Sequence, residues 1–185
     1  MTGLSALWLP ILLSAVFVFV ASSIIHMAMP WHKSDYAGVP NEDRVMEALR
    51  PFAIPPGDYM MPRPAKRQDM NSPEFLEKRK KGPVAIFTVM SADFSMGKTF
   101  VQWMLFLLGV GVVSAYVASR ALPASAPYLS VFRFAGTAAF LAHAGALWPM
   151  SIWYRRAWST TFKGTIDALI YAALTADTFG WLWPR

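Results

Sequence analysis

One stretch of this chain carries most of the side chains that could bind a metal. Residues 26–36 read His-Met-Ala-Met-Pro-Trp-His-Lys-Ser-Asp-Tyr and hold two of the three histidines in the sequence. Imidazole and thioether groups are soft enough to ligate copper(I), and Pro30 would hold the turn open. The candidate copper ligands are His26, Met27, Met29 and His32. The alternative is an anchor at a membrane surface, because methionine also fills apolar gaps at interfaces.

A second metal hypothesis is haem b held between two helices by paired histidines. His26 and His143 are the candidate axial ligands. By the rise per residue of a helix, their levels differ by about 8–10 Å, which is a poor match for two ligands on one iron. Copper and haem b are the only cofactors that these residues suggest.

Other catalytic chemistry finds little support in the sequence. The absence of cysteine removes disulfides, thiolate catalysis and iron–sulfur ligation. Residues 92–99 have the spacing of a phosphate-binding loop with alanine in place of its first glycine, but they would open a membrane helix rather than follow a strand. We find no serine–histidine–aspartate set and no close pair of carboxylates. No catalytic residue is therefore predicted, and a non-enzymatic role is favoured.

The elements that must position these residues are membrane helices. Apolar residues make up 55% of the chain and charged residues 15%, which is typical of a membrane protein because a soluble domain of this size could not bury so much apolar surface. A crossing needs about 20 apolar residues. Four segments supply them: Leu4–Ile25, Thr99–Ala118, Tyr128–Met150 and Gly164–Trp183. The sequence predicts an all-α integral membrane protein, a single membrane domain over residues 1–185 with four transmembrane helices in a bundle.

A polar insert over residues 31–98 separates the first two predicted helices. Asn41 and the acids after it predict a short helix that Pro51 ends, and Pro51–Pro64 predicts an extended strap. Ser72-Pro73-Glu74 predicts a second helix that closes at Gly82. Val84–Met90 fits either a strand or an interfacial segment. The second helix ends in four basic residues that would attract anionic lipid headgroups: Lys78, Arg79, Lys80 and Lys81.

Charge predicts the orientation of the chain in the membrane. The loop Ser151–Lys163 carries three basic residues and no acid. The positive-inside rule therefore places this loop and the insert in the cytoplasm, with both termini outside. The chain has no organelle signal, so we expect a bacterial inner membrane. The basic residues of the insert are mixed with acids, which argues against nucleic acid as a partner.

Polar residues inside the last two predicted spans are the other candidates for function, since charged groups there are costly and usually have partners. They are Arg133, His143, Asp167 and Asp177. Depth along the helices predicts an outer Arg133–Asp177 pair and an inner group of His143 and Asp167, which His26 could join. These groups suit either ties between helices or a proton relay.

Three functions follow from these patterns. The favoured one is a non-catalytic accessory or structural subunit that works through helix packing and its insert, with another membrane subunit or a second copy as partner. Rows of small residues support it, because they let helices approach closely in lipid. These rows are Gly111, Ala115 and Ser119, and Ala138, Ala142 and Ala146. The alternatives are a membrane copper or haem site and a small proton-coupled conduit.

Overall fold

The structure, a computed structural model, describes residues 3–184. Most of the described chain is helical, as the sequence predicts. Contacts within the chain divide it into two units. One is formed by the chain up to Ala37 together with the chain from Ser95 onward, and the other by Gly38–Phe94. The second unit lies within the segment 31–98 that the sequence marks as a polar insert.

Two helical stretches are long and apolar enough to cross a membrane, Leu4–Ala28 and Met96–Ala121. The first consists of a 3-10 turn, helix α1 (Trp8–Ser23) and a π-helical turn (Ile24–Ala28). Pro30 then prevents further α-helix because it has no N–H to donate, and a short 3-10 turn ends at His32. The second stretch is α4 (Met96–Ala121), whose first turn is capped by the Ser95 hydroxyl. Both occupy segments that the sequence predicts to span.

The third predicted span is interrupted. The structure has α5 (Tyr128–Ala144) and α6 (Leu147–Tyr154) in place of one continuous helix over Tyr128–Met150. Pro149 explains the interruption, because it cannot donate a hydrogen bond to the carbonyl of Gly145 four residues earlier. A continuous third helix was therefore a wrong prediction.

The fourth predicted span is helix α7 (Trp158–Trp181). Among the described residues, only the two stretches containing α1 and α4 meet the length and hydropathy expected of a spanning helix. Helix α5 has 17 residues and is too short, and α7 carries two aspartates that lower its hydropathy. Length and composition thus support two apolar crossings where the sequence predicts four.

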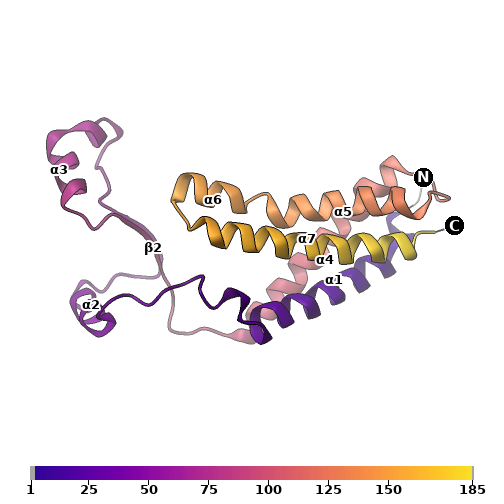
Figure 1. Cartoon of the computed structure of the whole chain (residues 1–185), viewed down its shortest axis with the longest axis horizontal. Helices are drawn as coiled ribbons and strands as arrows, with labels where there is room; N and C mark the ends of the chain where they lie inside the picture. Colours follow the sequence, from indigo (N-terminus) through magenta and orange to yellow (C-terminus); the bar gives the residue numbers. More distant parts are fainter. Residues whose placement is uncertain (1–2, 185) are drawn as a thin grey trace. The chain divides into compact units, whose positions relative to one another are not determined.

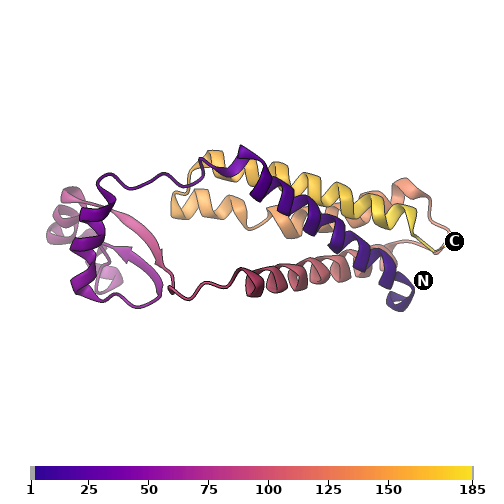
Figure 2. The same ribbon diagram turned by 90° about the horizontal axis from the view of Figure 1, so that it is seen from below.

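Four helices of the first unit pack side by side (Figures 1 and 2). Helix α1 contacts α4 and α7, and α5 contacts the same two helices. The start of α1, the connection from α4 to α5 and the end of α7 lie at one end of this unit, as Figure 1 shows. The segment after α1 and the connection from α6 to α7 therefore lie at the opposite end.

Small residues allow close approach at the predicted row on α4. A Cβ atom added to Gly111 would lie 3.2 Å from Ile11 Cγ2 of the first helix. Ala115 and Ser119, one and two turns further, are buried. The row predicted on the third span is not the packed one, since Ala142 and Ala146 are exposed. The buried residues of α5 are instead Val131, Ala135, Ala139 and Ala144.

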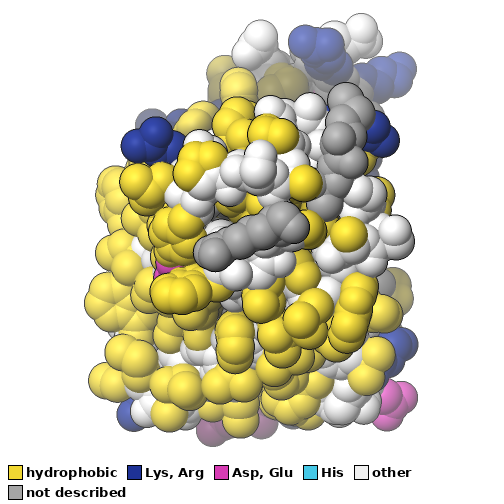
Figure 3. Space-filling model, turned by 90° about the vertical axis from the view of Figure 1, so that its right-hand side faces the viewer, with side chains coloured by type: hydrophobic (Ala, Val, Ile, Leu, Met, Phe, Trp, Pro, Cys, Tyr) yellow, Lys and Arg dark blue, Asp and Glu magenta, His cyan; other side chains and the backbone are white. Residues whose placement is uncertain are grey.

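The outer surface of these helices is apolar. Large hydrophobic side chains are strongly exposed on it, among them Leu105 at 62%, Leu141 at 62% and Trp181 at 75%. Figure 3 shows the end of the unit at which α1 begins and α7 ends. Hydrophobic side chains cover most of this face. Soluble monomers rarely expose apolar patches of this extent. Together with the two apolar helices, this surface favours association with a membrane.

The insert unit contains two helices and one small sheet. Helices α2 (Glu42–Leu49) and α3 (Pro73–Lys81) confirm the two helices predicted there, and the Ser72 hydroxyl accepts the Phe75 N–H at 3.2 Å. Strands β1 (Gly57–Met61) and β2 (Ala85–Val89) pair antiparallel, with Tyr59 opposite Phe87. The apolar run Val84–Met90 is thus a strand. The predicted strap Pro51–Pro64 is partly wrong, since β1 lies inside it.

Gly136 provides a test of the packing of α5 against α7. A Cβ atom there would lie 2.9 Å from the Ala176 Cβ, too close for two carbons. We expect Gly136→Leu to lower the thermal unfolding midpoint of the detergent-solubilised protein, since overpacking costs about 1–3 kcal/mol. Gly109→Leu is the matched control, because nothing described outside its own helix lies within 4 Å of a Cβ at that position. Equal losses in both variants would contradict the packing.

Candidate metal centre

The two histidines of the opening stretch lie face to face. After the π-helical turn the backbone of Met29 is extended, and the 3-10 turn that follows Pro30 carries His32 back over His26. The two rings stack with their centroids 4.2 Å apart and their planes inclined by 23°. The reversal of the chain therefore brings together two histidines six residues apart in the sequence.

A carboxylate from the last helix completes a group of three. Asp167, on α7, is 4% exposed, and its Oδ2 lies 2.8 Å from His32 Nε2. One ligand atom from each of His26, His32 and Asp167 lies within 4.8 Å of the others. The sequence placed Asp167 among the intramembrane polar residues rather than in the metal set. Its predicted depth near His26 was the only signal that linked it to the histidines.

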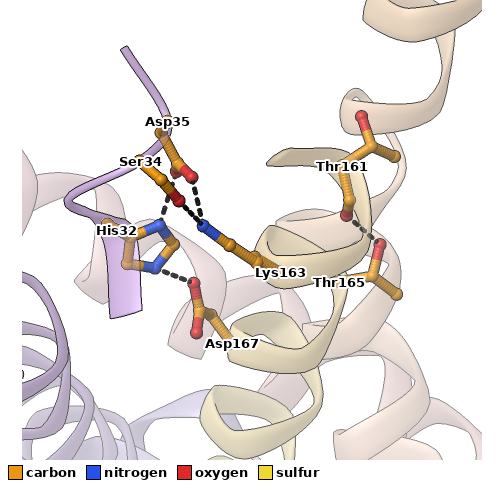
Figure 4. Close-up of polar contacts among 7 residues, drawn as sticks. All are labelled: His32, Ser34, Asp35, Thr161, Lys163, Thr165 and Asp167. Carbon is orange, nitrogen blue, oxygen red and sulfur yellow. Dashed lines mark hydrogen bonds and ion pairs between the residues drawn. The ribbon is translucent and has the colours of Figure 1, made fainter. Parts of the chain in front are cut away.

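Asp35 contacts the nitrogen of His32 that does not face Asp167 (Figure 4). His32 Nδ1 donates to Asp35 Oδ2 at 2.6 Å, and Lys163 Nζ donates to the other oxygen at 2.8 Å. Lys163 also donates to the Ser34 hydroxyl at 2.9 Å. Burial alone would raise the pKa of the Asp35 carboxyl, but the hydrogen bonds from Lys163 and His32 outweigh it and hold that pKa below its ordinary value. Asp35 is therefore an ionised acceptor at neutral pH.

This arrangement assigns a role to each nitrogen of His32. When Nδ1 carries the proton that Asp35 accepts, neutral imidazole presents the lone pair of Nε2 toward Asp167, while the His26 ring lies against the face of the His32 ring. A carboxylate that orients a ligating histidine in this way is the usual second layer of a protein metal site. Without a cation, the contact between His32 Nε2 and Asp167 Oδ2 needs one proton between the two atoms. The site thus accepts one positive charge, from a proton or from a metal ion.

The distance between His32 and Asp167 suits a small divalent ion. Ligand atoms at 2.0–2.1 Å from an ion lie about 3.0 Å apart in octahedral and about 3.3 Å apart in tetrahedral geometry. His32 Nε2 and Asp167 Oδ2, at 2.8 Å, need to separate by only a few tenths of an ångström. His26, an exposed residue of the π-helical turn, must move further and change rotamer to join them. Two imidazoles and one carboxylate leave further positions open for water or another ligand.

A cavity of about 430 Å³ adjoins the three residues. His26, His32 and Asp167 line it together with Arg156, while Trp103, Phe106 and Tyr171 supply its apolar wall. All of these residues belong to the same helical unit. The three residues therefore border a pocket that is lined by both polar and aromatic side chains.

The predicted thioether ligands lie outside this cavity. The Met27 side chain is 69% exposed and that of Met29 45%, and neither lines the cavity. The structure groups His26 and His32 with the carboxylate of Asp167. Copper ligation by all four residues stays a prediction, as does haem ligation by His26 and His143.

The predicted outer pair does not form. Asp177 accepts a hydrogen bond from the Tyr128 hydroxyl, and Arg133 makes no ion pair within residues 3–184. Matching depth was a poor guide here because each residue turns the helix by about 100°, so depth says nothing about which faces meet. The Arg133–Asp177 pair was a wrong prediction.

The predicted inner group forms only in part. His143 lines the same cavity as Asp167, but its ring packs edge-on against Phe106 and Tyr171, with centroids 5.7 and 5.3 Å away. Its Nε2 has no partner within the described part of the chain. The partner of Asp167 is His32, which the sequence did not place at this level.

Comparison with protein families, curated proteins and solved structures gives no match for this chain. The functional argument therefore depends on the geometry of the site.

Asp35→Asn tests the support behind His32. Because the pKa of Asp35 is depressed in the folded protein, its ionised form contributes stability above about pH 4 that is lost as the pH falls through the folded-state pKa. We expect the variant to melt below the wild type at neutral pH and the gap to narrow below about pH 4. Thermal unfolding in detergent over a pH series measures this. Asp93→Asn, at an exposed position, is the control and should show no such gap.

Proposed function

We propose that this chain is a multi-pass membrane protein that binds one divalent metal ion through His26, His32 and Asp167. The observation that carries the proposal is the convergence of two imidazoles and one buried carboxylate from opposite ends of the sequence. Asp35 and Lys163 support it, because they orient His32 and neutralise the charge behind it.

The donor set favours one class of ion. Two nitrogens and a carboxylate oxygen suit zinc, iron(II) or manganese(II), whereas copper(I) prefers sulfur. Three protein ligands are fewer than these ions bind, so the remaining positions take water or a substrate. An open site of this kind can polarise a bound group or activate water. A metal ion held by His26, His32 and Asp167 would supply that chemistry at one end of the helical unit.

The membrane topology is part of the proposal. We take α1, α4, α5 with α6, and α7 as four passes through a bacterial inner membrane, with both termini outside. The basic residues of the connection before α7 and the positive-inside rule put the metal centre and the insert at the cytoplasmic face. Asp167 is four residues beyond Lys163 on α7, close to this rim. A metal ion would offset the cost of a carboxylate at that depth.

Cysteine labelling tests the topology, since the chain contains no cysteine of its own. We expect an impermeant maleimide to reach Ser125→Cys, between α4 and α5, from outside the cell. Lys80→Cys in α3 and Trp153→Cys in α6 should be labelled only from the cytoplasmic side. If only α1 and α4 cross the membrane, Trp153→Cys will be labelled from outside with Ser125→Cys, and the four-pass proposal is wrong.

Metal analysis of the purified protein tests the centre itself. We expect about one zinc, iron or manganese ion per chain and at least tenfold weaker binding in His32→Ala and Asp167→Asn. The double variant Met27→Leu, Met29→Leu is the control and should bind the ion as the wild type does, because neither thioether lines the site.

Two other results would overturn the proposal. Bound copper that is lost in the methionine variant would establish the sulfur-containing ligand set instead. A protein that takes up no metal but purifies with a stoichiometric partner, lost when residues 38–94 are deleted, would favour the accessory subunit.

A further inference from the structure

We infer that the cavity beside the metal centre binds the anionic head of an amphipathic molecule, a carboxylate or phosphate on an apolar chain. The inference rests on the proposed metal site and adds the class of ligand. The metal and the Arg156 guanidinium would hold the anion, and the aromatic wall would receive the first part of the chain.

The first argument comes from polar groups that the protein leaves unsatisfied. Tyr171 is 5% exposed, and its hydroxyl has no hydrogen-bond partner within the described chain. His143 Nε2 is also buried and without a partner there. Both residues line the cavity. Buried polar groups are nearly always paired, and a molecule bound in this cavity would lie beside two that the described chain leaves without a partner.

The second argument is electrostatic. Arg156 lines the cavity and makes no ion pair among residues 3–184, in contrast to Lys163, which is bound to Asp35. Around the cavity the two negative charges of Asp35 and Asp167 equal in number the two positive charges of Lys163 and Arg156, although no ion pair among residues 3–184 joins Arg156 to Asp167. A divalent ion bound by neutral histidines then leaves two positive charges in excess. A partly buried excess of that size favours an anionic ligand, and an open metal position lets the anion bind directly.

The third argument is the apolar part of the lining. Trp103 and Phe106 face the cavity from α4, stacked with their centroids 5.4 Å apart, and Leu147 and Ala168 add aliphatic surface. A volume of about 430 Å³ falls in the range of sites for organic molecules. An inorganic anion would leave this surface in contact with water. A ligand with both an anionic head and a hydrocarbon segment satisfies the whole lining.

Cobalt spectroscopy on the full chain in dodecyl maltoside micelles, which contain no phosphate or carboxylate, tests the inference. Cobalt(II) substitutes for zinc and gives visible bands that change when a ligand binds the ion. The bands of the anion-free protein report the metal site separately, so failure to bind cobalt would reject the proposed function. Cobalt bands that do not change when any of the probes is added would reject the anionic ligand but leave the proposed metal site standing.

Three probes separate the parts of the proposed ligand. We expect dodecyl phosphate to shift the bands with a dissociation constant at least tenfold lower than that of either control probe. The controls are inorganic phosphate, which lacks the chain, and dodecanol, which lacks the anion. Inorganic phosphate binding as tightly as dodecyl phosphate would overturn the amphipathic ligand. Dodecanol acting as strongly would overturn the anion site.

Chain length identifies the source of the ligand. Binding of dodecyl phosphate but not butyl phosphate would support a lipid from the membrane. Equal binding of both would support a water-soluble organic phosphate with the same chemistry.

Neighbouring arginines give a matched pair of variants. We expect Arg156→Gln to weaken dodecyl phosphate binding about tenfold, since a charge-assisted hydrogen bond is lost. Arg155→Gln removes the same charge from the adjacent residue, which does not line the cavity, and should leave the affinity unchanged. Equal losses in both would show general attraction to the basic loop and overturn the assigned site. Tyr171→Phe should weaken binding by a smaller factor.

Discussion

The contact between Asp167 and His32 is the interaction on which the proposed site depends. A carboxylate buried among apolar helices is unstable unless a cation or several donors neutralise it. The protein supplies one imidazole nitrogen at 2.8 Å and uses the other nitrogen of the same ring to engage Asp35. Lys163 then balances Asp35 from the beginning of α7. The remaining need is one positive charge between His32 and Asp167.

This contact also has a structural role. It fastens the segment after α1 to α7, two parts of the chain separated by 135 residues. The Lys163 bonds to Ser34 and Asp35 reinforce the same connection. Pro30 and the π-helical turn direct the chain toward α7 at the level where α1 ends. The site is therefore built from the end of one helix, a reversed turn and the side of another helix, all within one packed unit.

Much of the local structure could be predicted from residue types. Helix α3 follows from Ser72, Pro73 and Gly82, because a cap, a first-turn proline and a terminal glycine act on the backbone beside them. Pro149 also indicates the interruption after α5, because proline lacks the backbone N–H that a continuous helix needs. The prediction of a continuous third span did not take this missing donor into account. The Arg133–Asp177 pair failed for a different reason. Helical rise gives depth, but packing decides which face of each helix meets its neighbour.

The sequence by itself determined that apolar helices dominate the chain, that a polar unit interrupts them after the first, and that His26 and His32, the histidines of the proposed site, follow α1 closely. Composition and nearby capping residues are enough for those features, since they act over a few residues. Only the tertiary structure decided that His32 meets Asp167, that Met27 and Met29 stay outside, and that Arg156, His143 and Tyr171 share one cavity. These placements depend on the rotation of α7 against α1 and on the reversal at Pro30. Both are set by the packing of many side chains from distant segments, which no local pattern records.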